Sequence, residues 1–309
     1  MSYTVVAEKL SRNELILLDG ATGTELERRG VPMDPNAWCG PSVAEHSDVL
    51  YEIHLDYLKL GCDIITANTF ASGPGMLRAA GFEDEHGSLV NQAVAVARAA
   101  TVESGREGET AVAGSMSHMI PVMPGTDAVD PSLGDVPESF EDDCRQHASA
   151  LSAAGVDMIL LEMMYHPERA AIAKEAACST GLPVWFGLSV REGSDGRPIL
   201  FDQHSERPIS QLFNLMDKNI DAVSIMHSRA DLVEPTLKQV RAFWQGPIAV
   251  YPDSGHFEMP KWNFNDVMSP AAFREYGTTW RDLGCAAIGG CCGLGPSHLA
   301  EFALPAHNM

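Results

Sequence analysis

Short apolar runs rich in β-branched residues recur along the whole chain, and stretches of helical length separate them. Each run ends at a polar residue or a glycine, which is typical of a buried strand that stops at the edge of a core. We predict eight strands, at residues 15–18, 62–67, 110–114, 156–161, 183–188, 221–226, 247–251 and 285–288. Between them the pattern predicts helices at residues 44–60, 87–103, 140–154, 167–179, 210–218, 234–243 and 271–283.

The regular alternation of strand and helix predicts a parallel sheet with both faces covered by helices. Eight such units favour an α/β fold of the (β/α)8 TIM barrel type. We expect a single domain over residues 1–309, because the sequence contains no internal repeat and no low-complexity linker. A doubly wound open sheet is the alternative architecture.

A barrel also predicts where the chemistry lies, because active sites of this fold form at the carboxyl ends of the strands. Side chains that can bind a metal and carboxylate side chains are both present at those ends. A polar residue at the end of a strand is common in itself, but this mixture of types is less common. The candidates are Asp19, Asn68, Ser115, Glu162, Ser189, His227, Asp253, Cys291 and Cys292.

Composition narrows the class of protein. The chain has 309 residues, 45% hydrophobic and 20% charged, as in ordinary globular proteins. Its net charge of -21 argues against nucleic acid or an anionic membrane as a partner. The first 18 residues are interrupted by charges and the chain has no long apolar run, so we expect a cytoplasmic protein without a membrane span. It should be a monomer or a small homo-oligomer.

The cysteines point to metal chemistry rather than to disulfides. Seven cysteines are scattered along the chain, which is no framework for a small secreted domain. Cys291 and Cys292 are adjacent and flanked by glycines, whose backbone freedom lets both thiolates face one zinc ion. A buried structural pair or a disulfide between neighbours would fit the same spacing.

Taken in order, a set of motifs resembles the homocysteine S-methyltransferase family, which includes enzymes that use betaine or S-methylmethionine as the methyl donor. The resemblance covers nearly the whole chain. The motifs that carry it are Asp19-Gly-Ala-Thr-Gly-Thr-Glu-Leu26, Trp38, Thr66-Ala-Asn-Thr-Phe70, Ala113-Gly-Ser115, Leu160-Leu-Glu162, Tyr251-Pro-Asp-Ser-Gly255, Trp262, Ile288-Gly-Gly-Cys-Cys-Gly293, Pro296 and His298.

The resemblance implies that Cys291 and Cys292 are two of the family's three zinc-binding cysteines. The third should end the sixth strand, where this chain has His227. Imidazole is a normal zinc ligand, so we predict a Cys2His site. Three thiolates leave the site at about -1, whereas two thiolates and an imidazole leave it near zero. We therefore expect a changed methyl donor or acceptor; alternatively, His227 merely ends its strand in a chain that has lost zinc.

The resemblance also implies substrate-binding residues around the metal. The acid matching Glu162 holds the amino group of homocysteine with Asp19 beside it, and aromatic faces hold a methylated cation by cation–π attraction. The predicted substrate-binding set is Asp19, Gly20, Trp38, Asn68, Phe70, Ser115, Glu162 and Asp253. The family has an asparagine at the position of Asp253 and usually an arginine at that of Gly293.

These features predict a zinc-dependent enzyme that transfers methyl from an onium donor to homocysteine, giving methionine, with no catalytic side chain beyond the metal site. The betaine enzymes have a tyrosine at the position of Phe70, and the chain ends soon after its cysteine pair. Both observations favour S-methylmethionine or a similar donor. A zinc hydrolase or lyase, and a non-catalytic binder of a methylated osmolyte, are the alternatives on the same barrel.

Overall fold

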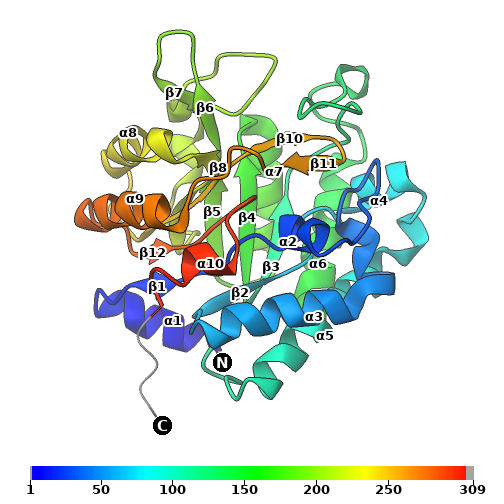
Figure 1. Ribbon diagram of the computed structural model, residues 1–309. Coiled ribbons are helices and arrows are strands. Elements are labelled where there is room, and N and C mark those ends of the chain that lie inside the picture. Colours follow the sequence, from blue (N-terminus) through cyan, green and yellow to red (C-terminus); the bar gives the residue numbers. More distant parts are fainter. Residues whose placement is uncertain (1, 304–309) are drawn as a thin grey trace.

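The computed structural model describes residues 2–303, and eight parallel strands form its centre with helices outside them (Figure 1). All eight predicted strands are confirmed. They are β1 (Ile16–Leu17), β2 (Ile64–Ala67), β3 (Ala111–Ser117), β4 (Met158–Met164), β5 (Val184–Leu188), β8 (Ala222–Arg229), β9 (Ile248–Asp253) and β12 (Ala287–Ile288).

The sheet closes on itself. The strand order is β1-β12-β9-β8-β5-β4-β3-β2, and a parallel bridge between Leu18 and Ile64 joins the two ends. The Asp63 amide donates to the Leu17 carbonyl at 2.7 Å, and the Asp19 amide donates to the Ile64 carbonyl at 3.0 Å. The predicted (β/α)8 barrel is therefore confirmed, and the open sheet is excluded.

Most predicted helices are also confirmed, with their ends shifted by a residue or a few. They are α3 (Val43–Lys59), α5 (His86–Glu103), α6 (Phe140–Ala154), α7 (Pro167–Cys178), α8 (Ala230–Arg241) and α9 (Pro270–Asp282). The helix predicted at 210–218 is wrong: the segment is the 3-10 helix η4 (Ile209–Leu215). Its two buried residues, Ile209 and Leu212, are three positions apart, which matches the 3-10 period.

Further elements lie outside the predicted set. Within α1 (Ser2–Ser11), Val6 is fully buried. Two hairpins, β6 (Val190–Glu192) with β7 (Pro198–Leu200) and β10 (His256–Glu258) with β11 (Lys261–Asn263), stand at the top of the barrel in Figure 1. The remaining short helices are α2 (Gly23–Arg28), η1 (Gly40–Ser42), α4 (Pro74–Ala80), η2 (Glu83–Glu85), η3 (Pro131–Leu133) and α10 (Pro296–Leu299).

Parallel strands covered on both sides are largely apolar on both faces, and the central strands β4 and β5 follow this rule. All seven residues of β4 and all five of β5 are buried. Within residues 2–303, none of the helices has both the length and the apolar character needed to cross a membrane.

Candidate metal and substrate site

A cavity of about 300 Å³ opens at the carboxyl ends of the barrel strands. Every residue predicted for the metal or for the substrate lines it, whereas Ser189 does not; its hydroxyl lies 3.2 Å from the Met226 sulfur. The eleven lining residues that were predicted are Asp19, Gly20, Trp38, Asn68, Phe70, Ser115, Glu162, His227, Asp253, Cys291 and Cys292.

His227, Cys291 and Cys292 form a compact triad of metal-binding atoms. Nδ1 of His227 lies 3.6 Å from Sγ of Cys291, the two Sγ atoms are 3.9 Å apart, and all three ligand atoms lie within 4.8 Å of one another. Around a tetrahedral zinc ion the corresponding separations are about 3.6 Å for nitrogen to sulfur and about 3.8 Å for sulfur to sulfur. No disulfide joins the two cysteines. The triad fits a tetrahedral soft-metal site.

A local distortion of β8 turns His227 into the cavity. The pairing of β8 with β9 shifts register between Met226 and Arg229, and His227 has a positive φ of 42°. A positive φ is unfavourable for a residue with a Cβ, and such strain is typical of functional sites. Strand β4, which is separated from β8 by β5, shifts register against β5 in the same way, with Met163 at φ 56° next to Glu162.

The triad carries protons that a cation would displace. Burial lowers the pKa of His227, but the Asp253 carboxylate and the Cys291 thiol raise it more, to about 9. The contact with Cys292 and burial raise the pKa of the Cys291 thiol well above its usual value. Thiolates in such a place need a positive partner, which a divalent cation supplies.

Hydrogen bonds on both sides fix the turn that carries the two cysteines. The Cys291 amide donates to the Pro252 carbonyl at 2.8 Å, and the Ser254 amide donates to the Cys292 carbonyl at 2.9 Å. Gly293 follows with φ 81°, and a Cβ there would lie 2.0 Å from the Ser254 carbonyl oxygen. Only glycine fits this position without movement of the backbone.

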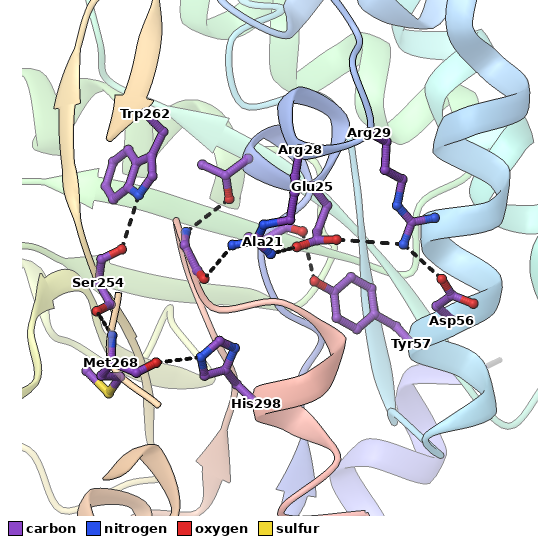
Figure 2. A network of polar contacts seen from close by, with 12 residues as sticks. Ala21, Glu25, Arg28, Arg29, Asp56, Tyr57, Ser254, Trp262, Met268 and His298 are labelled. Atoms are coloured by element: carbon purple, nitrogen blue, oxygen red, sulfur yellow. Dashed lines mark hydrogen bonds and ion pairs between the residues drawn. The ribbon is translucent and has the colours of Figure 1, made fainter. Parts of the chain in front are cut away.

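A polar network behind this turn connects it to α2, α3 and α10 (Figure 2). The Gly293 amide donates to Thr24 Oγ1 at 3.0 Å, and Arg28 donates to the Gly293 carbonyl at 3.2 Å. The Ser254 carbonyl accepts from Trp262 Nε1 at 3.1 Å. These contacts hold the ligand-bearing turn against the first βα connection.

Two buried carboxylates face the same cavity and are hydrogen-bonded to neutral groups. Asp19 is 2% exposed and accepts from the Thr66 amide at 2.6 Å and the Thr66 hydroxyl at 2.8 Å. Glu162 accepts from the Ser115 hydroxyl. Burial raises the pKa of Asp19 to about 7, with a further contribution from Glu162, and burial also raises the pKa of Glu162. A cationic ligand group would stabilise both ionised forms.

Two predicted residues have structural contacts that account for their identity. The side-chain amide of Asn68 donates to the Cys39 carbonyl at 2.9 Å and to Ser42 Oγ at 3.3 Å, and its oxygen accepts from the Cys39 thiol. At Gly20, a Cβ would lie 2.5 Å from the Leu294 carbonyl oxygen. Asn68 thus holds the loop before η1, and Gly20 permits close packing of two backbone segments.

Aromatic rings surround the opening above the triad. The Trp38 ring lies 5.7 Å from Phe257, Phe201 lies 5.4 Å from His227, and Trp262 lies 6.0 Å from His227, all edge to face. Phe70 completes this lining. The sequence prediction missed Phe201 and Phe257. The sequence does contain a signal for the hairpin that carries Phe257, because polar and apolar residues alternate on both sides of Met259-Pro260.

The model of the homocysteine S-methyltransferase family matches residues 16–304. Homocysteine S-methyltransferase of Escherichia coli is 27% identical over 95% of this chain and 96% of its own length. Selenocysteine methyltransferase of Astragalus bisulcatus is 23% identical over 91% of this chain and 89% of its own length. The crystal structure of the homocysteine methyltransferase from Escherichia coli in its metallated form superposes with a TM-score of 0.75 at 23% identity, covering 97% of this chain and 99% of that one.

Proposed function

Because the chain belongs to the homocysteine S-methyltransferase family, we propose that it transfers a methyl group from an onium donor, S-methylmethionine or a similar compound, to the thiol of homocysteine. The product is methionine. The observation that carries the proposal is that one cavity holds both the His227, Cys291 and Cys292 triad and the two buried carboxylates Asp19 and Glu162.

We propose that the triad holds Zn²⁺. Two thiols and an imidazole are ligands that zinc prefers, and three protein ligands leave a position for substrate. The bound cation would lower the pKa of a coordinated thiol so that the thiolate forms near neutral pH. The chain's part is to present the three ligand atoms on the rigid ends of β8 and β12.

The acceptor amino acid would lie between the triad and the carboxylates. Asp19 and Glu162 are held by Thr66 and Ser115, so their oxygens are already oriented when an ammonium group arrives. A substrate without an ammonium would leave two buried acids without a counter-charge. This favours an α-amino thiol such as homocysteine over a simple alkyl thiol.

The donor would approach through the aromatic opening. A sulfonium or quaternary ammonium group has no hydrogen to donate, and ring faces attract it and exclude water. Trp38 and Phe70 line this part of the cavity. Phe70 lacks the hydroxyl that the betaine enzymes have at this position, which weakens the case for betaine as the donor.

We also propose that residues 1–309 act as a single domain of this family, supported by the match over residues 16–304. All seven cysteines are free, which supports a reducing, cytoplasmic setting.

The test is zinc analysis of the purified protein joined to an assay of homocysteine with a panel of onium donors, read out as methionine by mass spectrometry. We expect near-stoichiometric zinc and methionine from S-methylmethionine or a related donor. A chelator should abolish the reaction, and zinc should restore it. Zinc-loaded protein that makes no methionine from any donor would favour a hydrolase or lyase, and protein that neither binds zinc nor forms product would favour a binding protein.

A further inference from the structure

A second cavity, of about 270 Å³, lies between α4, α6 and the loop that follows β3. Figure 1 shows α4 and α6 on the same side of the barrel. The wall of this cavity is mainly apolar and includes Met116, Ile120, Phe140 and Cys144. Leu133 also lines it and is 38% exposed, so an apolar ligand would cover it. An apolar cavity of about 150 Å³ holds benzene, so this one has room for a ring or a chain of about six to ten heavy atoms.

The charged groups of this second cavity pair with one another. Arg78 and Asp143 are the two charged side chains among the described residues that line it. Arg78 donates to both oxygens of Asp143, at 2.9 and 3.2 Å, and to Glu83 at 2.8 Å. The Ser139 hydroxyl donates to Asp143 at 3.0 Å. A charged ligand would have to break this pairing, so the cavity selects against one.

The remaining polar side chains are also occupied. His147 lines the cavity, and its Nδ1 lies 3.0 Å from Nε2 of His86 while its Nε2 lies 3.4 Å from the Ser115 carbonyl oxygen. Burial and the neighbouring His86 lower the pKa of His147 to about 4, so the ring is neutral at neutral pH. The Ser117 hydroxyl oxygen accepts from the Met119 amide at 3.1 Å. The surface left for a ligand therefore suits an uncharged apolar group.

The second cavity shares a wall with the metal and substrate cavity. Phe70, Met76 and Met119 line both. Methionine side chains are unbranched and flexible, so they adapt to the shape of a ligand. Phe70 is also one of the aromatic residues proposed to contact the donor's positive charge. A donor whose cation lies against Phe70 can therefore extend another substituent into the second cavity. S-methylmethionine would leave this space empty, because its one large substituent carries charged groups.

We propose that the second cavity receives an uncharged apolar substituent of the methyl donor. The range of donors then extends to sulfonium compounds that carry an alkyl chain or a ring besides the methyl group to be transferred. The bond between sulfur and the methyl carbon breaks as the acceptor thiolate attacks that carbon, its electron pair stays on the donor sulfur, and the donor leaves as a neutral thioether. The acceptor's thiol proton passes to solvent. This inference rests on the proposed methyltransferase function.

The first test measures binding alone, by calorimetry without an acceptor thiol. The probes are tetramethylammonium and hexyltrimethylammonium, which share a cation and differ in one apolar chain. We expect the hexyl compound to bind wild-type protein about 10- to 100-fold more tightly, because its chain is buried. Cys144→Phe and Ala79→Phe add a ring at residues that line only the second cavity. Each should lower the affinity for the hexyl compound by about 10-fold and leave that for tetramethylammonium unchanged.

The matched control is Ala271→Phe, because Ala271 is exposed on α9 and lines neither cavity. Both affinities should equal those of the wild-type protein. Equal affinity of the wild-type protein for the two probes overturns the proposal. A preference for the hexyl compound that persists in the filled variants also overturns it, since the chain would then lie in the first cavity. Ala79 is exposed and tolerates a larger side chain, so Ala79→Phe decides the question if Cys144→Phe does not fold.

The second test measures methyl transfer. Hexyldimethylsulfonium and trimethylsulfonium are supplied with homocysteine, and methionine is the readout. We expect kcat/KM to be about 10-fold higher for the hexyl compound, and this advantage should disappear in Ala79→Phe. Methionine formed equally well from both donors would retain the proposed function and overturn the role of the second cavity. Chain-dependent binding without methionine from either donor would refute the proposed function and, with it, the assignment of the cavity to a donor.

Discussion

Nδ1 of His227 lies 3.6 Å from Sγ of Cys291, although 64 residues separate them in the chain and β9 lies between their strands in the sheet. The contact is possible because the closed barrel brings the carboxyl ends of its strands around one cavity. The register shift in β8 then turns the imidazole inward. The arrangement of His227, Cys291 and Cys292 therefore results from barrel closure together with one local distortion of β8.

Replacing His227 should remove the metal. We expect His227→Asn to lower zinc affinity by more than about 100-fold, because only two strong ligands, Cys291 and Cys292, remain. This loss is larger than the loss of about 10- to 100-fold that is usual when a residue that only hydrogen-bonds to a metal ligand is replaced. Asparagine tolerates a positive φ, so the loss would not come from backbone strain. His227→Cys should keep zinc bound through three thiolates. Metal analysis after dialysis is the measurement, and full zinc content in His227→Asn would show that His227 is no ligand.

The fold and the set of residues that line the cavity could be predicted from the sequence, because both depend on the local pattern of apolar and polar residues. Each strand is a short apolar run, and its end is marked by a polar residue, so the barrel rule alone gathers Asp19, Glu162 and Cys291 at one rim. The roles of these residues stay predictions that the experiments above are designed to test.

Other features could not be predicted because they depend on tertiary contacts. Phe201 and Phe257 belong to loops and hairpins whose direction is set by packing over the barrel mouth. The pairing of Asp253 with His227 depends on the register shift in β8, which has no marker in the amino-acid order. The 3-10 geometry at Ile209–Leu215 likewise reflects how two buried side chains meet the barrel.

Gly293→Ala should damage both stability and the metal site. The new Cβ would lie 2.0 Å from the Ser254 carbonyl oxygen at φ 81°, so the cysteine turn must shift away from β9. We expect the free energy of unfolding to fall by about 2–4 kcal/mol and zinc affinity to fall with it. Gly196→Ala is the matched control, with φ 77° but its nearest neighbour at 3.8 Å, and should cost about 1 kcal/mol. Urea denaturation of the two variants makes the comparison, and equal losses would contradict the clash.

Asp19→Asn should stabilise the substrate-free protein at high pH and not at low pH. Burial raises the pKa of Asp19 from 3.8 to about 7, so its ionised form destabilises the folded state by up to about 4 kcal/mol above pH 7. That cost is relieved as the pH falls from 7 to 4 and the folded protein takes up the proton. Asparagine can still accept from the Thr66 amide. Urea denaturation at pH 4 and pH 8 measures the difference, and an equal effect at both would refute the assignment.

Trp38 offers the sharpest test of donor recognition. Its ring lines the cavity edge to face with Phe257, and it packs on α2, where a Cβ at Gly23 would lie 2.3 Å from the ring. Because a cation–π contact contributes about 1–2 kcal/mol, we expect Trp38→Leu to raise the KM of an onium donor by about 10-fold. Trp38→Phe should recover part of the loss because it restores an aromatic face. The KM for homocysteine should change little in either variant. Equal increases in the KM values of donor and acceptor would indicate general damage to the cavity instead of a lost contact with the donor's positive charge.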